Sequence, residues 1–201
     1  MATVGELIKK SDKSTDIGIV LDESGSMESL KDTVVKCFND FLKEQKEEGD
    51  DAFITFSKFN SEVNFVIKRK KISSVKSIND DTYQPCGTTA LYDAIFFTIK
   101  EIEKKNKNNN VIIAIITDGY ENASRECTID TIKKEIKEKE ELGWKFLFLA
   151  SNIDVKSVAG SFGMNTNNAR AFVSSHEGYT MMNKSLTSCV TNYRVQARTI
   201  I

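Results

Sequence analysis

Asp22, Ser24 and Ser26 place one carboxylate and two hydroxyl groups at alternating positions of a short segment. The segment follows the apolar run 17–21, which is typical of a buried strand. Gly25 lies between the two serines and permits a sharp turn. An oxygen-rich loop of this kind suits a hard divalent cation. The first chemistry to expect of this chain is therefore metal coordination by oxygen.

Two later loops could complete such a site. Thr88 and Thr89 precede an expected helix, and Asp118 follows the apolar run 111–116. The residue types leave open which of the two threonines would contribute its hydroxyl. No thiolate or imidazole accompanies these oxygens, so Mg²⁺ or Mn²⁺ is favoured over zinc, with Ca²⁺ less favoured.

One division of roles would give this site a binding function. Ser24, Ser26 and Thr89 would bind the cation directly, while Asp22 and Asp118 would act through water. The inner protein ligands would then be neutral. The cation would keep its positive charge and an open position, and it would attract a carboxylate from outside.

The surrounding pattern alternates strands with helices, which predicts an α/β fold with a largely parallel sheet. Buried strands are expected at 15–21, 111–116 and 144–150, and alternating residues at 52–59 and 63–67 predict a hairpin. We expect a doubly wound six-stranded sheet in the order 3-2-1-4-5-6, with one antiparallel edge strand and helices on both faces. Later elements are a short helix at 155–162, a strand at 171–173 and a helix over 182–197.

This topology would bring the three loops together. In a doubly wound sheet, ligands bind beyond the carboxyl ends of the strands, where the strand order reverses. Asp22 ends the first strand and Asp118 ends the fourth, and these strands are neighbours across the reversal. The loop containing Thr88 and Thr89 would reach the same edge.

The chain length of 201 residues indicates one domain, which we place at 14–201 after a polar N-terminal arm at 1–13. The formal net charge is −1, from 28 basic and 29 acidic residues, and gives no reason to expect nucleic acid or an anionic membrane as the partner. The run 68–71 is basic. A solvated strand end or turn explains it best, and a basic binding patch is the alternative.

No apolar run is long enough to cross a membrane, and the first ten residues lack the features of a signal peptide. Cys37, Cys86, Cys127 and Cys189 are widely spaced, without a metal-binding pattern. Free thiols in a reducing compartment, and hence a cytoplasmic protein, are expected. The only histidine, His176, lies in a different segment from Cys86, so a catalytic pair is disfavoured.

The motif residues carry a family resemblance. The chain resembles the von Willebrand factor type A domain family, whose metal-ion-dependent adhesion site reads DxSxS, then Thr, then Asp. Asp22, Ser24 and Ser26 match the first element, Thr89 the second and Asp118 the third. Thr88 stands where many relatives carry glycine. The resemblance covers roughly residues 14–198 and is closest in wording to free-standing members from bacteria and their phages.

The resemblance implies a non-enzymatic module. Such domains bind proteins through a bridging Mg²⁺ or Mn²⁺, to which the partner supplies a Glu or Asp carboxylate. Intracellular members often act within assemblies, sometimes beside AAA-type ATPases. For this chain, no nucleic acid or membrane partner is expected.

Three other interpretations compete with this one. A Mg²⁺-dependent phosphatase or phosphotransferase would want a second aspartate at the position of Ser24 and a basic group for the phosphoryl oxygens. A dinucleotide-binding domain would want GxGxxG where this chain has acidic and hydroxyl residues. Gly25 and Gly119 could also be plain turn residues, with Ser24 or Ser26 capping a helix.

Overall fold

The computed structural model describes residues 14–49, 51–106 and 110–199, so the arm expected at 1–13 lies outside the described residues. A six-stranded sheet has the order β3-β2-β1-β4-β5-β6. Every neighbouring pair is parallel except β2 and β3. The predicted topology and antiparallel edge are confirmed. The strands are β1 Thr15–Asp22, β2 Ala52–Phe59, β3 Val63–Lys71, β4 Val111–Thr117, β5 Lys145–Ala150 and β6 Ala169–Ala171.

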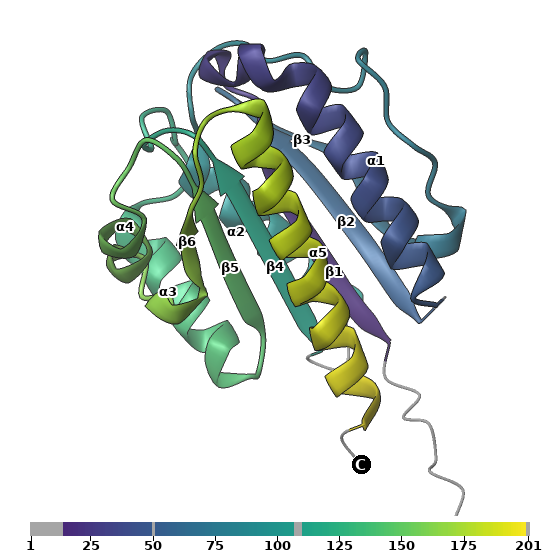
Figure 1. Ribbon diagram of the computed structural model, residues 1–201. Helices are drawn as coiled ribbons and strands as arrows, with labels where there is room; N and C mark the ends of the chain where they lie inside the picture. The colour runs from purple at the N-terminus through teal and green to yellow at the C-terminus, as the bar shows by residue number, and fades with distance from the viewer. Residues whose placement is uncertain (1–13, 50, 107–109, 200–201) are drawn as a thin grey trace, which may run out of the picture.

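Helices cover both faces of this sheet (Figure 1). Helices α1 and α5 lie side by side on one face, and α2, α3 and α4 cover the other. Each long helix has one apolar stripe, as a helix packed on a sheet requires. Their bounds are α1 Lys31–Glu47, α2 Leu91–Glu103, α3 Ile129–Glu141, α4 Val155–Ser161 and α5 His176–Thr199, with 3₁₀ turns η1 Gly25–Leu30, η2 Ile72–Ser74 and η3 Thr166–Asn168.

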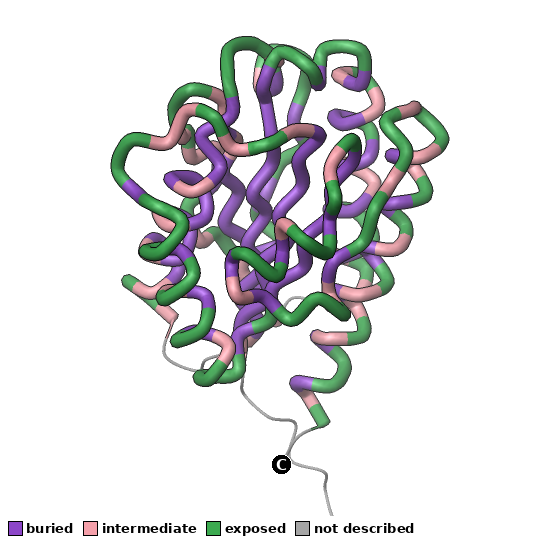
Figure 2. The backbone as a smooth tube through the Cα atoms, turned by 90° about the vertical axis from the view of Figure 1, so that its left-hand side faces the viewer, coloured by how far each residue is buried: buried purple, intermediate pink, exposed green. Residues whose placement is uncertain are grey.

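The core consists of two apolar layers, one on each face of the sheet. Figure 2 shows that the buried backbone gathers at the centre of the molecule, where the sheet runs. Every residue of β1 and β4 is buried, so the two strands that carry the site lie at the centre of the molecule. A strand buried on both faces reads as a continuous apolar run, which is why the sequence revealed these two so clearly.

The last strand differs in detail from expectation, and the first helix is preceded by a 3₁₀ turn. β6 spans Ala169–Ala171 rather than 171–173, because pairing with β5 begins at the buried Ala169 and ends at Ala171. The amide of Phe172 still donates to the carbonyl of Ala150 at 3.0 Å. The first helix opens with the 3₁₀ turn Gly25–Leu30 before α1 begins.

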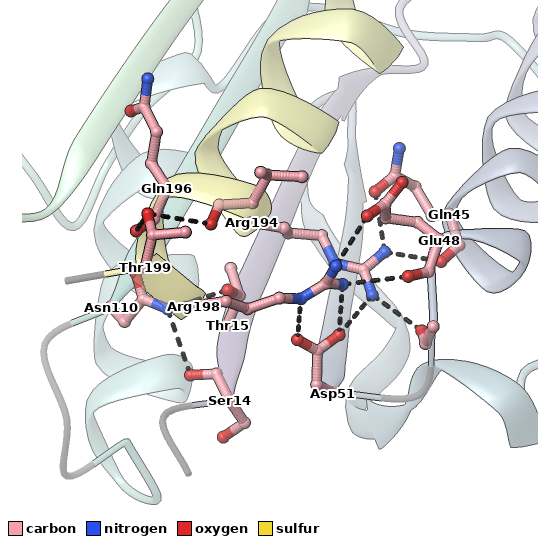
Figure 3. Close-up of polar contacts among 12 residues, drawn as sticks. Ser14, Thr15, Gln45, Glu48, Asp51, Asn110, Arg194, Gln196, Arg198 and Thr199 are labelled. Carbon is pink, nitrogen blue, oxygen red and sulfur yellow. Dashed lines mark hydrogen bonds and ion pairs between the residues drawn. The ribbon is translucent and has the colours of Figure 1, made fainter. Parts of the chain in front are cut away.

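A buried arginine of α5 contacts the segment just before β2 (Figure 3). This segment lies at the opposite end of the β1–β2 pair from Asp22. Arg194 is fully buried and donates to the carbonyl oxygens of Gln45 and Gly49 at 2.5 and 2.7 Å. It also contacts Asp51 Oδ1 at 2.7 Å, and Arg198 binds the same carboxylate. A buried charge with several acceptors is costly to disturb, so this cluster helps set the position of α5.

Candidate metal site

Asp22 anchors the first loop of the site. It is the last residue of β1, and its side chain is fully buried. Its Oδ1 accepts a hydrogen bond from the backbone N–H of Ser24 at 2.7 Å. Its Oδ2 accepts one from the hydroxyl of Thr117, at the end of β4, at 2.5 Å. Asp22 therefore ties the ends of the two central strands together.

The two serines face the same point rather than capping the helix. Ser24 occupies the N-cap position of η1 but makes no side-chain capping hydrogen bond. Its Oγ lies 3.2 Å from Ser26 Oγ, and Ser26 Oγ donates to Asp118 Oδ1 at 2.5 Å. The plain capping role considered for Ser24 does not describe this geometry. The carboxylates and hydroxyls of the first and third motif elements form one hydrogen-bonded cluster.

The two threonines have different surroundings. Thr88 is exposed, and its hydroxyl lies 2.8 Å from Ser61 Oγ. Thr89 is buried, and a Cβ placed on Gly119 would lie 3.9 Å from its Oγ1. Thr89, not Thr88, thus faces the loop that carries Asp118.

The loop after β4 is fastened to the start of α2. Asn122 Oδ1 accepts from the backbone N–H of Thr89 at 2.8 Å, and the N–H of Asn122 donates back to the Thr89 carbonyl at 3.0 Å. In the first turn of α2, the buried carboxylate of Asp93 accepts from the N–H groups of Arg125 and Cys127, both at 2.8 Å. These bonds hold the Thr89 and Asp118 loops in a fixed relation.

A second set of bonds fastens the loop before α2 to the DxSxS segment. Glu23 is buried, with Oε1 2.8 Å from Lys58 Nζ and 2.5 Å from the N–H of Gln84.

Tyr83, also buried, donates its hydroxyl to the Asp22 carbonyl at 2.6 Å. Burial raises the pKa of Tyr83, so its hydroxyl stays a neutral donor. The N–H of Gly25 completes the contact by donating to the Gly87 carbonyl at 3.2 Å.

Several of these positioning residues were missed from the sequence. Asn122 and Tyr83 carry no motif signal, because each acts through a backbone group distant in sequence. Thr117 directly precedes Asp118, and its place at the end of a buried strand was the available clue. Glu23 lies inside the strand-end motif, but nothing in the sequence indicated its contacts with Lys58 and Gln84.

The electrostatics of the cluster leave a negative charge uncompensated. Within residues 14–49, 51–106 and 110–199, neither Asp22 nor Asp118 forms an ion pair with a lysine, arginine or histidine. Burial raises the pKa of Asp22, hydrogen bonds from Thr117 and Ser24 oppose the rise, and the charge of Asp118 adds to it. Two buried, adjacent carboxylates without a basic partner fit the donor set of a hard divalent cation.

Other polar groups near the site have separate tasks. Asn152 adopts a positive φ of 60° and lies 3.4 Å from the Asp118 carbonyl through its Nδ2. Asp154 caps α4 by accepting from the N–H of Ser157. Cys86 Sγ contacts the side chain of Asn60, while His176, the exposed first residue of α5, contacts Thr33. Cys86 and His176 therefore make these side-chain contacts with different residues, Asn60 and Thr33 respectively.

A comparison with known protein families identifies the family of this chain. The model of the von Willebrand factor type A domain matches residues 16–188. The chain belongs to the von Willebrand factor type A domain family. Members of this family are typically protein-binding or adhesion modules and are generally non-enzymatic. A search of curated protein sequences gives no significant match.

Solved structures share the fold at low sequence identity. The minor pilin PilB of Streptococcus sanguinis superposes with a TM-score of 0.68 at 12% identity, over 90% of this chain and 62% of the pilin. The vWF domain of the pili tip protein Mfa5 from Porphyromonas gingivalis gives 0.68 at 8%, over 90% and 96%. The manganese-loaded TRAP protein of Plasmodium vivax gives 0.57 at 14%, over 88% and 74%. This chain thus spans less than two thirds of the pilin.

Across the described part of the chain, no helix combines the length and the apolar character needed to cross a bilayer. The same residues contain no group of three or more His, Cys, Asp or Glu side chains able to hold a metal. The candidate site combines two carboxylates with hydroxyl groups instead.

Proposed function

We propose that this type A domain binds a partner protein through a divalent cation, Mg²⁺ or Mn²⁺, held by Asp22, Ser24, Ser26, Thr89 and Asp118. The observation that carries the proposal is the pair of buried carboxylates, Asp22 and Asp118, with no basic partner in the described structure. Asp118 accepts from the hydroxyl of Ser26, Asp22 accepts from the backbone N–H of Ser24, and the two serine hydroxyls lie 3.2 Å apart, which supports a shared oxygen site.

The residues present suggest how a partner would be recognised. Ser24, Ser26 and Thr89 would offer neutral oxygens, while the two aspartates would orient them and supply charge through water. A cation held in this way supplies a Lewis-acidic position for an outside carboxylate. Ser26 is the exposed member of the cluster, so the open position would face solvent on its side. A Glu or Asp of the partner protein is the group this arrangement would take.

A phosphatase or phosphotransferase is the weaker candidate. Asp22 would be its nucleophile, but both oxygens of that carboxylate already accept hydrogen bonds and the side chain is fully buried. Lys58, a basic residue that contacts the motif segment, is engaged in an ion pair with Glu23. These contacts favour a binding module over an enzyme.

Titration calorimetry of Mg²⁺ and Mn²⁺ into the chelator-stripped full chain tests the proposal. Asp118→Asn keeps an acceptor for Ser26 but removes the charge, while Asp130→Asn makes the same change at an exposed position of α3. We expect saturable binding by the parent and by Asp130→Asn, and its loss in Asp118→Asn. Equal binding by both variants would contradict the site, and no binding by the parent would indicate a metal-independent scaffold.

We further propose a cytoplasmic protein of bacterial or phage origin, working within an assembly that could include an ATPase. Support comes from the wording of the motif and from Cys37, Cys86, Cys127 and Cys189, all free thiols. PilB and Mfa5 are named as pilus proteins, so location needs its own test. Immunodetection in fractionated source cells should find the chain with the soluble contents, and recovery from the envelope or medium would contradict this.

A further inference from the structure

A second surface lies at the β3 edge of the sheet and shares no residue with the proposed metal site. A groove of about 300 Å³ runs between β3 and the segment 75–82. Its apolar side chains come from both walls and include Val66, Val75 and Ile78. Val75 and Ile78 are buried, so the groove has a firm apolar floor rather than a loose surface cluster.

The outer wall of this groove is pinned to α1. Asn39 donates through Nδ2 to the carbonyl of Ile78 and accepts through Oδ1 from its N–H, both at 2.9 Å. Lys46 Nζ donates to the Val75 carbonyl at 2.6 Å. The groove is therefore preformed, which lowers the entropic cost of seating a ligand.

Three exposed lysines, Lys68, Lys70 and Lys76, also line the groove. Within the described structure none of the three forms an ion pair with an acidic side chain. Arg69, in the middle of the run, is different because its Nε lies 2.8 Å from Asp16 Oδ1. The three lysines thus give the groove a positive rim without ion pairs in the described structure; Asp80 and Asp81, exposed in the segment 75–82, do not line the groove.

β3 is also the end strand of the sheet, so its outer side pairs with no other described strand. Such an edge presents unpaired backbone groups that can accept an extended peptide. Lysines on an edge discourage pairing with a second copy of the same edge, because like charges repel. The same charges attract an acidic strand, and the groove beside them could take its apolar side chains.

We propose that this groove docks an extended acidic segment of a partner protein. The segment would add to the free edge of β3, place carboxylates near Lys68, Lys70 and Lys76, and seat apolar side chains over Val66 and Val75. Under this proposal, lysines of the basic run 68–71 bind carboxylates of the partner, whereas a merely solvated strand end would have no binding function.

Fluorescence polarisation of the full chain with a labelled peptide of alternating Glu and Val tests the proposal. A Lys/Val peptide of equal length controls for charge, and single-stranded DNA of similar length tests for general polyanion binding. The triple variant Lys68→Glu, Lys70→Glu, Lys76→Glu reverses the rim. A matched variant reverses three exposed lysines on α3, α4 and α5, namely Lys137, Lys156 and Lys184.

We expect saturable binding of the Glu/Val peptide, about tenfold or more weaker in the rim variant and near parental in the matched variant. Chelator should change nothing, because the groove and the metal site share no residue. Failure of the acidic peptide to bind at millimolar concentration, or equal binding of the Lys/Val peptide, would overturn the proposal. DNA binding that equals peptide binding and is lost in the rim variant would show a polyanion site instead.

Discussion

Ser26 Oγ donates a hydrogen bond to Asp118 Oδ1 at 2.5 Å, although 92 positions separate the two residues. The contact closes the loop after β1 against the loop after β4, at the point where the strand order reverses. It holds a hydroxyl and a carboxylate of the proposed metal site side by side, so binding of a cation there would require little rearrangement of the two loops.

The first prediction concerns this hydroxyl. Ser26→Ala should weaken Mg²⁺ or Mn²⁺ binding by about tenfold or more, because it removes a proposed ligand and the contact that orients Asp118. Ser29→Ala, an exposed serine of the same 3₁₀ turn, is the matched control. Calorimetry on the chelator-stripped variants measures the metal affinity of each. Equal affinities would show that Ser26 is not a metal ligand.

The second prediction separates the adjacent threonines. Thr89→Ala should lower metal affinity, because Thr89 is buried beside Gly119, whereas Thr88→Ala should leave it unchanged, because Thr88 contacts Ser61 in an exposed loop. Thermal melts would show whether both variants stay folded. The assignment is wrong if Thr88→Ala is the variant that loses metal.

The fold was largely predictable, and the reason is visible in two strands. β1 and β4 are buried on both faces, and they contain the apolar runs 17–21 and 111–116. Asp22 is the last residue of β1, and Asp118 directly follows Thr117, the last residue of β4. Given those ends, the reversal of strand order places Asp22 beside Asp118.

The positioning contacts were not predictable in the same way. Asn122 binds the backbone of Thr89 across 33 residues, and Tyr83 binds the carbonyl of Asp22 across 61. A hydrogen bond to a distant backbone group leaves no periodic trace in a sequence. For the same reason, nothing in the pattern indicated that Arg194 would be fully buried in a polar helix.

The third prediction tests the central strand. Ile115 is fully buried in β4, so Ile115→Ala should lower the free energy of unfolding by about 2–5 kcal/mol through lost burial and a residual cavity. Val173→Ala, at a side chain that is 70% exposed, should change it by about 0.5 kcal/mol or less. Urea unfolding measures both, and similar losses would contradict the placement of Ile115.

The fourth prediction concerns pH and the cluster that holds α5. Burial alone would raise the pKa of Asp51, but hydrogen bonds from Arg198 and Arg194 outweigh it and hold the pKa well below its usual range. The stabilisation is therefore fully present above the unfolded pKa of about 3.9 and is lost as pH falls below that value. Partial exposure of Asp51 screens the pairs and reduces the size of the effect.

Asp51→Asn should accordingly be less stable than the parent at neutral pH, and the gap between them should narrow as pH falls below about 4. Urea unfolding across this range measures the gap, with Asp130→Asn as the exposed control that should track the parent. A gap that stays constant with pH would mean that Asp51 contributes through packing rather than charge. A narrowing gap would identify the two arginines as the charged partners that fasten α5 to the start of β2.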